Sequence, residues 1–209
     1  IAYLLIKGLV KTVVTTNFDV LIERALLDLN PNINLNNQFD ILYKEEDLSR
    51  IDWTNNKCKI IKLHGSANDI ASMAITLKQV SNQISPDYKT NIIRNIFSKG
   101  EHKYVLMLGY SCSDYFDINP QIELINDNYK TIYFIQHDRR YKVEGLNLKQ
   151  SLNPFKKFKD SYRCYYNTNN LSKELIKRFC DYRQTNFPKP KIIDWKESLN
   201  DWLLGLESS

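Results

Sequence analysis

Short β-branched or aromatic runs alternate along the chain with longer stretches whose apolar residues have helical spacing. The strand-like runs cover residues 11–16, 39–43, 58–63, 104–108, 131–135 and 161–166, with a shorter candidate at 74–77. The run at 104–108 is apolar almost throughout, which is typical of a strand covered on both faces of a parallel sheet. The alternation predicts an α/β domain with a Rossmann-like parallel sheet and helices on both faces.

Helical patterns occupy most of the intervals between these runs. We expect helices over residues 20–29, over 79–97 with a break at Pro86, from about Asp117, and over 170–183 with Asn169 or Asn170 as the N-cap. The first six residues read as part of a helix. A proline-rich connector at 185–191 leads to an apolar helical face made by Ile192, Trp195, Leu199, Trp202 and Leu206. The pattern thus predicts one domain over 1–184, followed by a connector and an amphipathic helix over 185–209.

Composition narrows the class of protein. The 209 residues carry a net charge of +5, and 43% of them are hydrophobic and 25% charged, as in ordinary soluble domains. No apolar run approaches the roughly 18 residues of a membrane-spanning helix. The four cysteines lie far apart and form no CxxC pair, which disfavours a structural zinc site and favours a reducing, cytoplasmic compartment.

Polar clusters follow the strand-like runs directly. They are TTNFD at 15–19, LHGS at 63–66, GYSCSD at 109–114 and IQHD at 135–138. In an open α/β sheet, ligands bind at the carboxyl ends of the strands. Asn, Asp, His and Ser side chains gathered at that edge predict a polar pocket suited to a sugar or a nucleotide.

Taken in order, these clusters resemble the sirtuin-like superfamily, and within it the bacterial branch that hydrolyses NAD in anti-phage defence. The matching pieces span about residues 10 to 180 and are the segments 15–23, 62–66, 108–111 with Asp114, and 117–120. The resemblance implies that Asn17 holds the ribose next to nicotinamide and helps to place an attacking water. His64 would act as the general base, a task that suits a side chain with an ordinary pKa of about 6.5.

The resemblance assigns further residues to the NAD site. Asp19 would lie beside the carboxamide, and Gly109 and Ser111 would contact the adenosine phosphates and ribose through a close backbone approach and a hydroxyl group. Gln136 and Asn170 are similar in position to contacts with the adenosine. The remaining residues assigned to NAD binding are Thr16, Tyr110 and Asp114.

The sequence departs from the family in two places. Sirtuin-like domains open with a strand and a glycine-rich loop that cradles the pyrophosphate, but Gly8 is the only glycine before Gly65. We therefore expect the chain to be truncated, with that loop lying before Ile1. Deacylating sirtuins also carry a four-cysteine zinc module after the histidine, whereas residues 68–76 contain no cysteine. This favours the zinc-free hydrolase branch, with NAD as substrate and no metal.

The implied function is hydrolysis of NAD to nicotinamide and ADP-ribose by a triggered effector of anti-phage defence. Its expected partners are NAD or ADP-ribose, further copies of itself in a homo-oligomer, and a phage-derived trigger or an additional domain. A non-catalytic sensor of NAD or ADP-ribose would share the fold without needing His64. An interaction scaffold with a decayed site is the third alternative.

Each candidate residue also has a purely structural interpretation. Asn17 and Asp19 could cap the helix that follows, His64 could be a turn residue, and Gly109 to Ser111 could form an ordinary tight turn. His102 and His137 are expected at the surface. The basic stretches at 139–142 and 156–159 interleave aromatics but are expected to be solvated faces rather than a nucleic-acid site. The helical face at 192–206 is expected to pack on protein rather than on a membrane.

Overall fold

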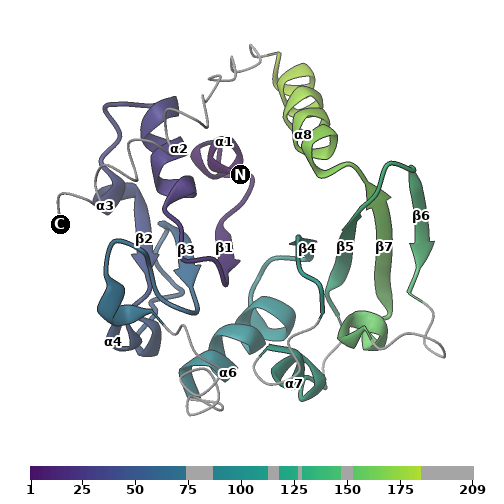
Figure 1. The fold of residues 1–209 in the computed structure, drawn as a ribbon, viewed down its shortest axis with the longest axis horizontal. Coiled ribbons are helices and arrows are strands. Elements are labelled where there is room, and N and C mark those ends of the chain that lie inside the picture. Colours follow the sequence, from purple (N-terminus) through teal and green to yellow (C-terminus); the bar gives the residue numbers. More distant parts are fainter. Residues whose placement is uncertain (74–86, 113–117, 127–128, 147–152, 185–209) are drawn as a thin grey trace, which may run out of the picture. The chain divides into compact units, whose positions relative to one another are not determined.

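The computed structural model describes residues 1–73, 87–112, 118–126, 129–146 and 153–184 (Figure 1). The chain divides into two compact units, Ile1–Leu175 and Ile176–Ser209. The described part of the second unit, residues 176–184, contains the end of helix α8 (Thr168–Arg183). The strand expected at 74–77, the helix start at 79–86, Asp114, Asp117 and the segment 185–209 lie outside the described residues.

A three-stranded parallel sheet forms in the first half of the chain. Its strands have the spatial order β1-β3-β2, and β3 pairs with both neighbours. The elements in chain order are α1 (Ala2–Ile6), β1 (Thr12–Thr15), α2 (Leu21–Leu29), α3 (Leu35–Gln38), β2 (Phe39–Leu42), α4 (Glu45–Ser49), β3 (Cys58–Lys62) and the 3₁₀ turn η1 (Ile70–Ser72). Every residue of β3 is buried, as expected for a central strand covered on both faces.

A four-stranded sheet forms in the second half, with the order β4-β5-β7-β6. The pairs β4–β5 and β5–β7 are parallel, and only the edge strand β6 runs antiparallel. The elements are α6 (Asp87–Arg94), the π-helical turn η2 (Asn95–Lys99), β4 (Tyr104–Leu108), α7 (Ile118–Glu123), β5 (Thr131–His137), β6 (Lys142–Gly145), the 3₁₀ turn η3 (Pro154–Lys157), β7 (Asp160–Tyr166) and α8.

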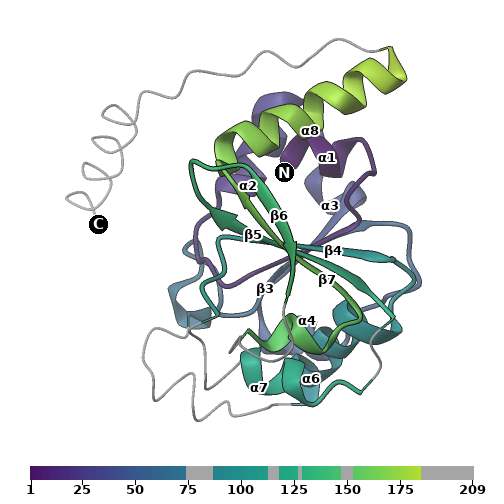
Figure 2. The same ribbon diagram turned by 90° about the vertical axis from the view of Figure 1, so that its right-hand side faces the viewer.

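Alternate residues of β3 enter two different hydrophobic clusters. Ile60 packs with Leu5 of α1 and Leu26 of α2, whereas Ile61 packs with Ile92 of α6 and Ile122 of α7. Figure 2 shows α1 and α2 on one side of the strands and α4, α6 and α7 on the other. The predicted α/β fold with a parallel sheet flanked by helices is thereby confirmed.

The structure corrects several local predictions. Strand β5 continues to His137, so Gln136 and His137 belong to the strand and not to a loop after it. The short elements β6, α3 and α4 were not predicted, because four or five residues rich in charge or asparagine carry no clear hydrophobic period. Helix α8 begins at Thr168, and Asn167 Oδ1 accepts from the N–H groups of Asn169 and Asn170. The capping residue is therefore Asn167.

Two interpretations of basic or histidine side chains are also corrected. His102 is half buried rather than at the surface, and its Nε2 lies 2.6 Å from the Ile96 carbonyl oxygen. Lys157 is not on a solvated face: its Nζ donates to the Ile122 and Glu123 carbonyls, at 3.0 and 2.6 Å, at the end of α7. Phe158, an interleaved aromatic, is 1% exposed and belongs to the core.

Candidate functional site

The loops that follow β1 and β3 are joined by backbone hydrogen bonds. The Leu63 N–H donates to the Thr15 carbonyl at 2.9 Å, and the Ala67 N–H donates to the Phe18 carbonyl at 2.8 Å. The rings of Phe18 and His64 lie with their centroids 6.4 Å apart. Parallel strands end at the same edge of a sheet, so these bonds bring the exposed Asn17 and the half-buried His64 to neighbouring loops.

Local hydrogen bonds shape the first loop. Thr15 Oγ1 accepts from the Asn17 N–H at 3.0 Å, and Asp19 Oδ1 accepts from the Leu21 N–H at 3.1 Å, at the start of α2. Asp19 thus forms an Asx turn just before α2, but the N-cap residue of α2 is Val20, and this helix has no side-chain capping bond. The half-buried Thr16 lies in this loop as well, so four assigned residues, Thr16, Asn17, Asp19 and His64, belong to one pair of joined loops.

A buried lysine lies beneath these loops. Lys62, the last residue of β3, is 1% exposed and places its ammonium 2.6 Å from Glu23 Oε1, 2.7 Å from the Asp19 carbonyl and 2.9 Å from Ser66 Oγ. Sequence reasoning assigned no role to Lys62 or Glu23. The available signal was a lysine at the end of the fully buried run CKIIKL, since a lysine at such a position needs a partner.

The turn after His64 requires glycine. Gly65 has a φ of +94°, and a Cβ at this position would lie 2.2 Å from the Ser72 carbonyl oxygen. Ser72 Oγ accepts from the Ser66 N–H at 3.0 Å and donates to the Asp69 carbonyl at 2.6 Å. The segment 65–72 is therefore a tightly closed turn, and it fixes the backbone on one side of His64.

A second polar site lies at the carboxyl ends of β4 and β5. A pocket of about 470 Å³ opens there, and four of its lining residues, Gly109, Tyr110, Ser111 and Gln136, are among those assigned to NAD. Gly109 has a φ of +66°, and a Cβ on it would meet no atom within 4 Å. Backbone is consequently accessible to a ligand at this point. The other lining residues are Cys112, Phe134, Ile135, His137, Asn153 and Arg163.

The loop after β4 is tied to the start of α7. The Tyr110 hydroxyl donates to Asn119 Oδ1 at 2.6 Å, and Asn119 Nδ2 donates to the Cys112 carbonyl at 2.8 Å. Cys112 itself adopts a φ of +59°, an uncommon conformation for a side chain with a Cβ. Burial raises the pKa of the Cys112 thiol to about 11, which keeps it protonated near neutral pH. Cys112 thus shapes the pocket wall as a neutral thiol.

One assigned residue that the structure describes, Asn170, is not brought into these groups. Asn170 is exposed in the first turn of α8, where its N–H contributes to the cap at Asn167, and it does not line the pocket. Asp114 lies outside the described residues. Arg163, by contrast, lines the pocket although no sequence pattern distinguishes it from the other residues of its strand. Cross-strand pairing explains its position, because Arg163 lies opposite Phe134 in the β5–β7 register.

A comparison with protein families places the chain in a known family. Residues 11–155, about two thirds of the chain, match the sequence profile of the SIR2-like domain. The chain belongs to the SIR2-like domain family. SIR2-like domains use NAD, and the family includes NAD-dependent enzymes, which confirms the resemblance at the level of the superfamily. No curated protein shows significant sequence similarity to the chain.

The lining of the pocket at β4 and β5 suits a nucleotide. The 470 Å³ pocket offers the open backbone of Gly109, the Ser111 hydroxyl, the Gln136 amide and the Arg163 guanidinium, which suit the phosphates, sugar and base of a nucleotide. Among the described residues, no three His, Cys, Asp or Glu side chains are grouped so that they could hold a metal ion. In the same part of the chain, no helix is both long and apolar enough to cross a membrane.

Proposed function

We propose that this SIR2-like domain hydrolyses NAD to nicotinamide and ADP-ribose, with Asn17 and His64 as the catalytic residues. The observation that carries the proposal is the pair of backbone hydrogen bonds, Leu63 to Thr15 and Ala67 to Phe18, which join the two loops on which these residues lie. Two polar side chains of the types that sugar chemistry needs thereby share the carboxyl edge of one parallel sheet.

The reaction consumes one water and releases one proton. The bond between the ribose C1′ and the pyridinium nitrogen breaks, and its electron pair neutralises the nicotinamide that leaves. The C1′ carbon passes through an oxocarbenium-like state and is attacked by water, which Asn17 positions together with the ribose. His64 accepts the proton as the general base. The products are nicotinamide, ADP-ribose and a proton, so the step balances without a metal or a covalent nucleophile.

The pocket at β4 and β5 would hold the adenosine end of NAD. Gly109, Tyr110, Ser111 and Gln136 supply its backbone and polar contacts, as the resemblance implies, and Arg163 adds a positive charge. The contributions of Thr16, Asp19 and Asn170 to NAD binding remain part of the proposal. So do the separate connector and helix at 185–209.

The biological role proposed with this activity is that of a triggered effector in anti-phage defence. It rests on the resemblance to the zinc-free, NAD-hydrolysing branch of the superfamily. The proposed setting is a homo-oligomer in the cytoplasm, held inactive until a phage-derived trigger or another domain of the same protein releases it.

Nicotinamide release from NAD by the full-length gene product tests the activity. Asn17→Ala and His64→Ala should each lower kcat by at least about 100-fold, because the roles assigned to them are general-base catalysis and positioning of the water. The matched controls are Asn56→Ala, in the loop before β3, and His102→Gln, and both should keep kcat within about twofold.

Two results would contradict the proposal. Release that survives both site variants would refute the assignment of Asn17 and His64. A parent protein that binds NAD but releases no nicotinamide, with or without phage infection of the producing cells, would favour the non-catalytic sensor.

A further inference from the structure

The ammonium of Lys62 contacts three segments: the loop after β1, the helix α2 that directly follows this loop, and the loop after β3, which directly follows Lys62. It reaches Glu23 in α2, the Asp19 carbonyl in the loop after β1 and Ser66 in the loop after β3. An ammonium group has three N–H donors, and each of these donors has one acceptor within 2.6–2.9 Å. The side chain is therefore saturated, and its position is determined by all three segments at once.

These three contacts involve residues close in sequence to the candidate catalytic residues. Asp19 lies two residues after Asn17, and His64 lies between Lys62 and Ser66 in the chain. The backbone bonds between the loops, from Leu63 to Thr15 and from Ala67 to Phe18, run beside the lysine. A movement of either loop would have to break at least one contact with Lys62.

The ion pair between Lys62 and Glu23 is expected to contribute little to the stability of the protein. Lys62 is 1% exposed and the Glu23 side chain 12%, so both charges have lost most of their hydration. Glu23 Oε2 is buried and makes no hydrogen bond in the structure. Buried pairs with such unsatisfied atoms contribute little stability relative to apolar side chains of similar volume. What the ammonium adds over an apolar side chain is directional bonding to two loops.

We propose that Lys62, supported by Glu23, is a positioning residue that sets the Asn17 loop and the His64 loop relative to each other. The inference rests on the proposed function, since the arrangement of those two loops matters for catalysis only if they carry the reaction. Lys62 does not touch the reacting atoms. Its effect is on the geometry of the groups that do, and a displacement of about 1 Å in such groups can lower a rate about 100-fold.

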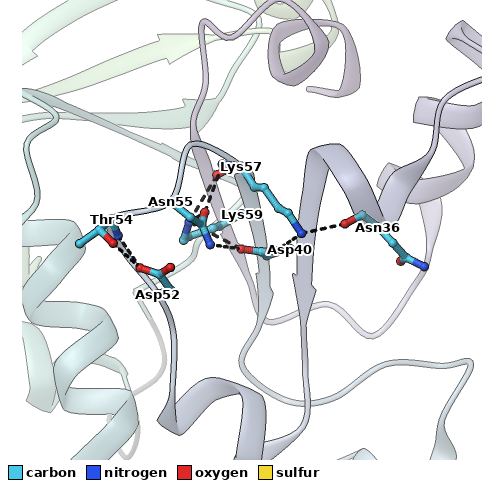
Figure 3. A network of polar contacts seen from close by, with 7 residues as sticks. All are labelled: Asn36, Asp40, Asp52, Thr54, Asn55, Lys57 and Lys59. Atoms are coloured by element: carbon cyan, nitrogen blue, oxygen red, sulfur yellow. Dashed lines mark hydrogen bonds and ion pairs between the residues drawn. The ribbon is translucent and has the colours of Figure 1, made fainter.

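The same strand supplies a matched control. Lys59 in β3 is as deeply buried as Lys62, with 4% of its side chain exposed, and it also pairs with a carboxylate, Asp40 of β2. Figure 3 shows that its other contacts are local: Nζ donates to Asn55 Oδ1 at 2.8 Å and to the Lys57 carbonyl at 3.3 Å. This pair lies at the amino end of the strand and contacts neither candidate catalytic loop.

The experiment replaces each buried pair in the full-length protein and measures nicotinamide release from NAD. In Lys62→Met combined with Glu23→Met, we expect kcat to fall about 10- to 100-fold while KM changes less than about threefold, because positioning acts on the reacting groups rather than on the binding of the adenosine half. In Lys59→Met combined with Asp40→Asn, kcat should stay within about twofold.

Amide hydrogen exchange gives a readout that does not depend on activity. The amides of Leu63 and Ala67 bond to the loop after β1, and they should exchange at least about tenfold faster in the Lys62 and Glu23 double variant than in the parent protein. The amide of Lys59 bonds to the Lys11 carbonyl at the other end of the strand and should keep its rate in that variant.

The outcomes separate the two proposals. If the parent protein binds NAD but releases no nicotinamide, with or without phage infection of the producing cells, the proposed function fails, and the exchange rates still decide whether Lys62 holds the loops together. If the Lys62 variant keeps its kcat within about twofold, or if its Leu63 and Ala67 amides exchange at the parental rate, the positioning role is wrong. An equal loss of kcat in the Lys59 variant would also overturn it, because the effect would then follow from removing any buried pair.

Discussion

Each end of strand β3 contains a buried lysine that is paired with a carboxylate, but the two lysines contact different kinds of segment. At each end a buried lysine meets a carboxylate, but Lys59 is bound by residues of its own turn and of the adjacent strand β2, whereas Lys62 is bound by a helix and two loops. Ligands of parallel α/β sheets bind at the carboxyl edge, where Lys62 lies. Burial and an ion pair are common to both lysines, so these two features do not distinguish the proposed positioning residue. The segments that each lysine contacts do distinguish it.

The carboxylates also differ in how much support they have. Asp40 accepts from Asn55 Nδ2 at 2.9 Å and pairs with Lys57 at 3.3 Å in addition to Lys59. Glu23 pairs with Lys62 through one oxygen, and its other oxygen is buried without a hydrogen bond to any described residue. Within the part of the chain that the structure describes, Asp40 therefore has several partners, while Glu23 has Lys62 as its one cation.

The largest expected effect comes from removing each lysine singly. Lys62→Met leaves Glu23 as a buried charge without its cation, which should lower the free energy of unfolding by about 3–5 kcal/mol. Lys59→Met should cost only about 1–2 kcal/mol, because Asp40 keeps Lys57 and Asn55 as partners. Urea unfolding of both variants measures the difference. If both variants lost the same unfolding free energy, the contacts of Asp40 with Lys57 and Asn55 would not compensate for the loss of Lys59.

Adding Glu23→Met to Lys62→Met sharpens this comparison. The second substitution removes the isolated charge and should restore most of the lost stability, since an apolar pair of similar volume is often as stable as a buried ion pair. A double variant no more stable than Lys62→Met would mean that the lost bonds to Asp19 and Ser66, rather than the charge on Glu23, determine the cost.

A smaller loss of stability is expected when glycine is replaced by alanine at two positions, Gly65 after β3 and Gly8 before β1. Gly65→Ala places a Cβ 2.2 Å from the Ser72 carbonyl oxygen in a backbone with φ +94°, so the turn after β3 has to move. We expect a loss of at least about 2 kcal/mol, together with disturbance of His64. Gly8, which precedes β1, has φ +67°, but its Cβ would meet only Lys11 Nζ at 3.8 Å.

Gly8→Ala is therefore the control, and the strain of a left-handed alanine should limit its cost to about 1 kcal/mol. Thermal unfolding measures both substitutions. A loss at Gly65 no larger than that at Gly8 would contradict the close packing of the turn against residues 72 and 73.

The sequence was sufficient to predict the fold and the edge of the sheet where the candidate site lies. It was less informative about the side-chain contacts within that site. Long apolar runs such as 104–108 have a clear period and appear as strands, and motif order placed Asn17 and His64 in neighbouring loops. The role of Lys62 could not be predicted, because it depends on Asp19, Glu23 and Ser66 meeting at one point in three dimensions. Arg163 reaches the pocket through strand pairing across residues that are far apart in sequence, which no local pattern encodes.

The smallest expected effect is on the pH dependence of the unfolding free energy. It tests whether His102, which lies just before β4, contributes to this dependence. Burial, and to a lesser extent the positive charge of Lys130, lower the pKa of His102 from its ordinary value, while the bond to the Ile96 carbonyl opposes this. The folded protein therefore prefers neutral His102, whereas the unfolded chain takes up a proton near pH 6.5. This contribution to stability is present above about pH 6.5 and is lost as the pH falls through the lower folded-state pKa.

His102→Gln keeps an N–H donor for the Ile96 carbonyl and removes the titration, so its unfolding free energy should fall less than that of the parent protein between about pH 7.5 and pH 5. Identical pH profiles for the two proteins would show that His102 does not determine the acid sensitivity.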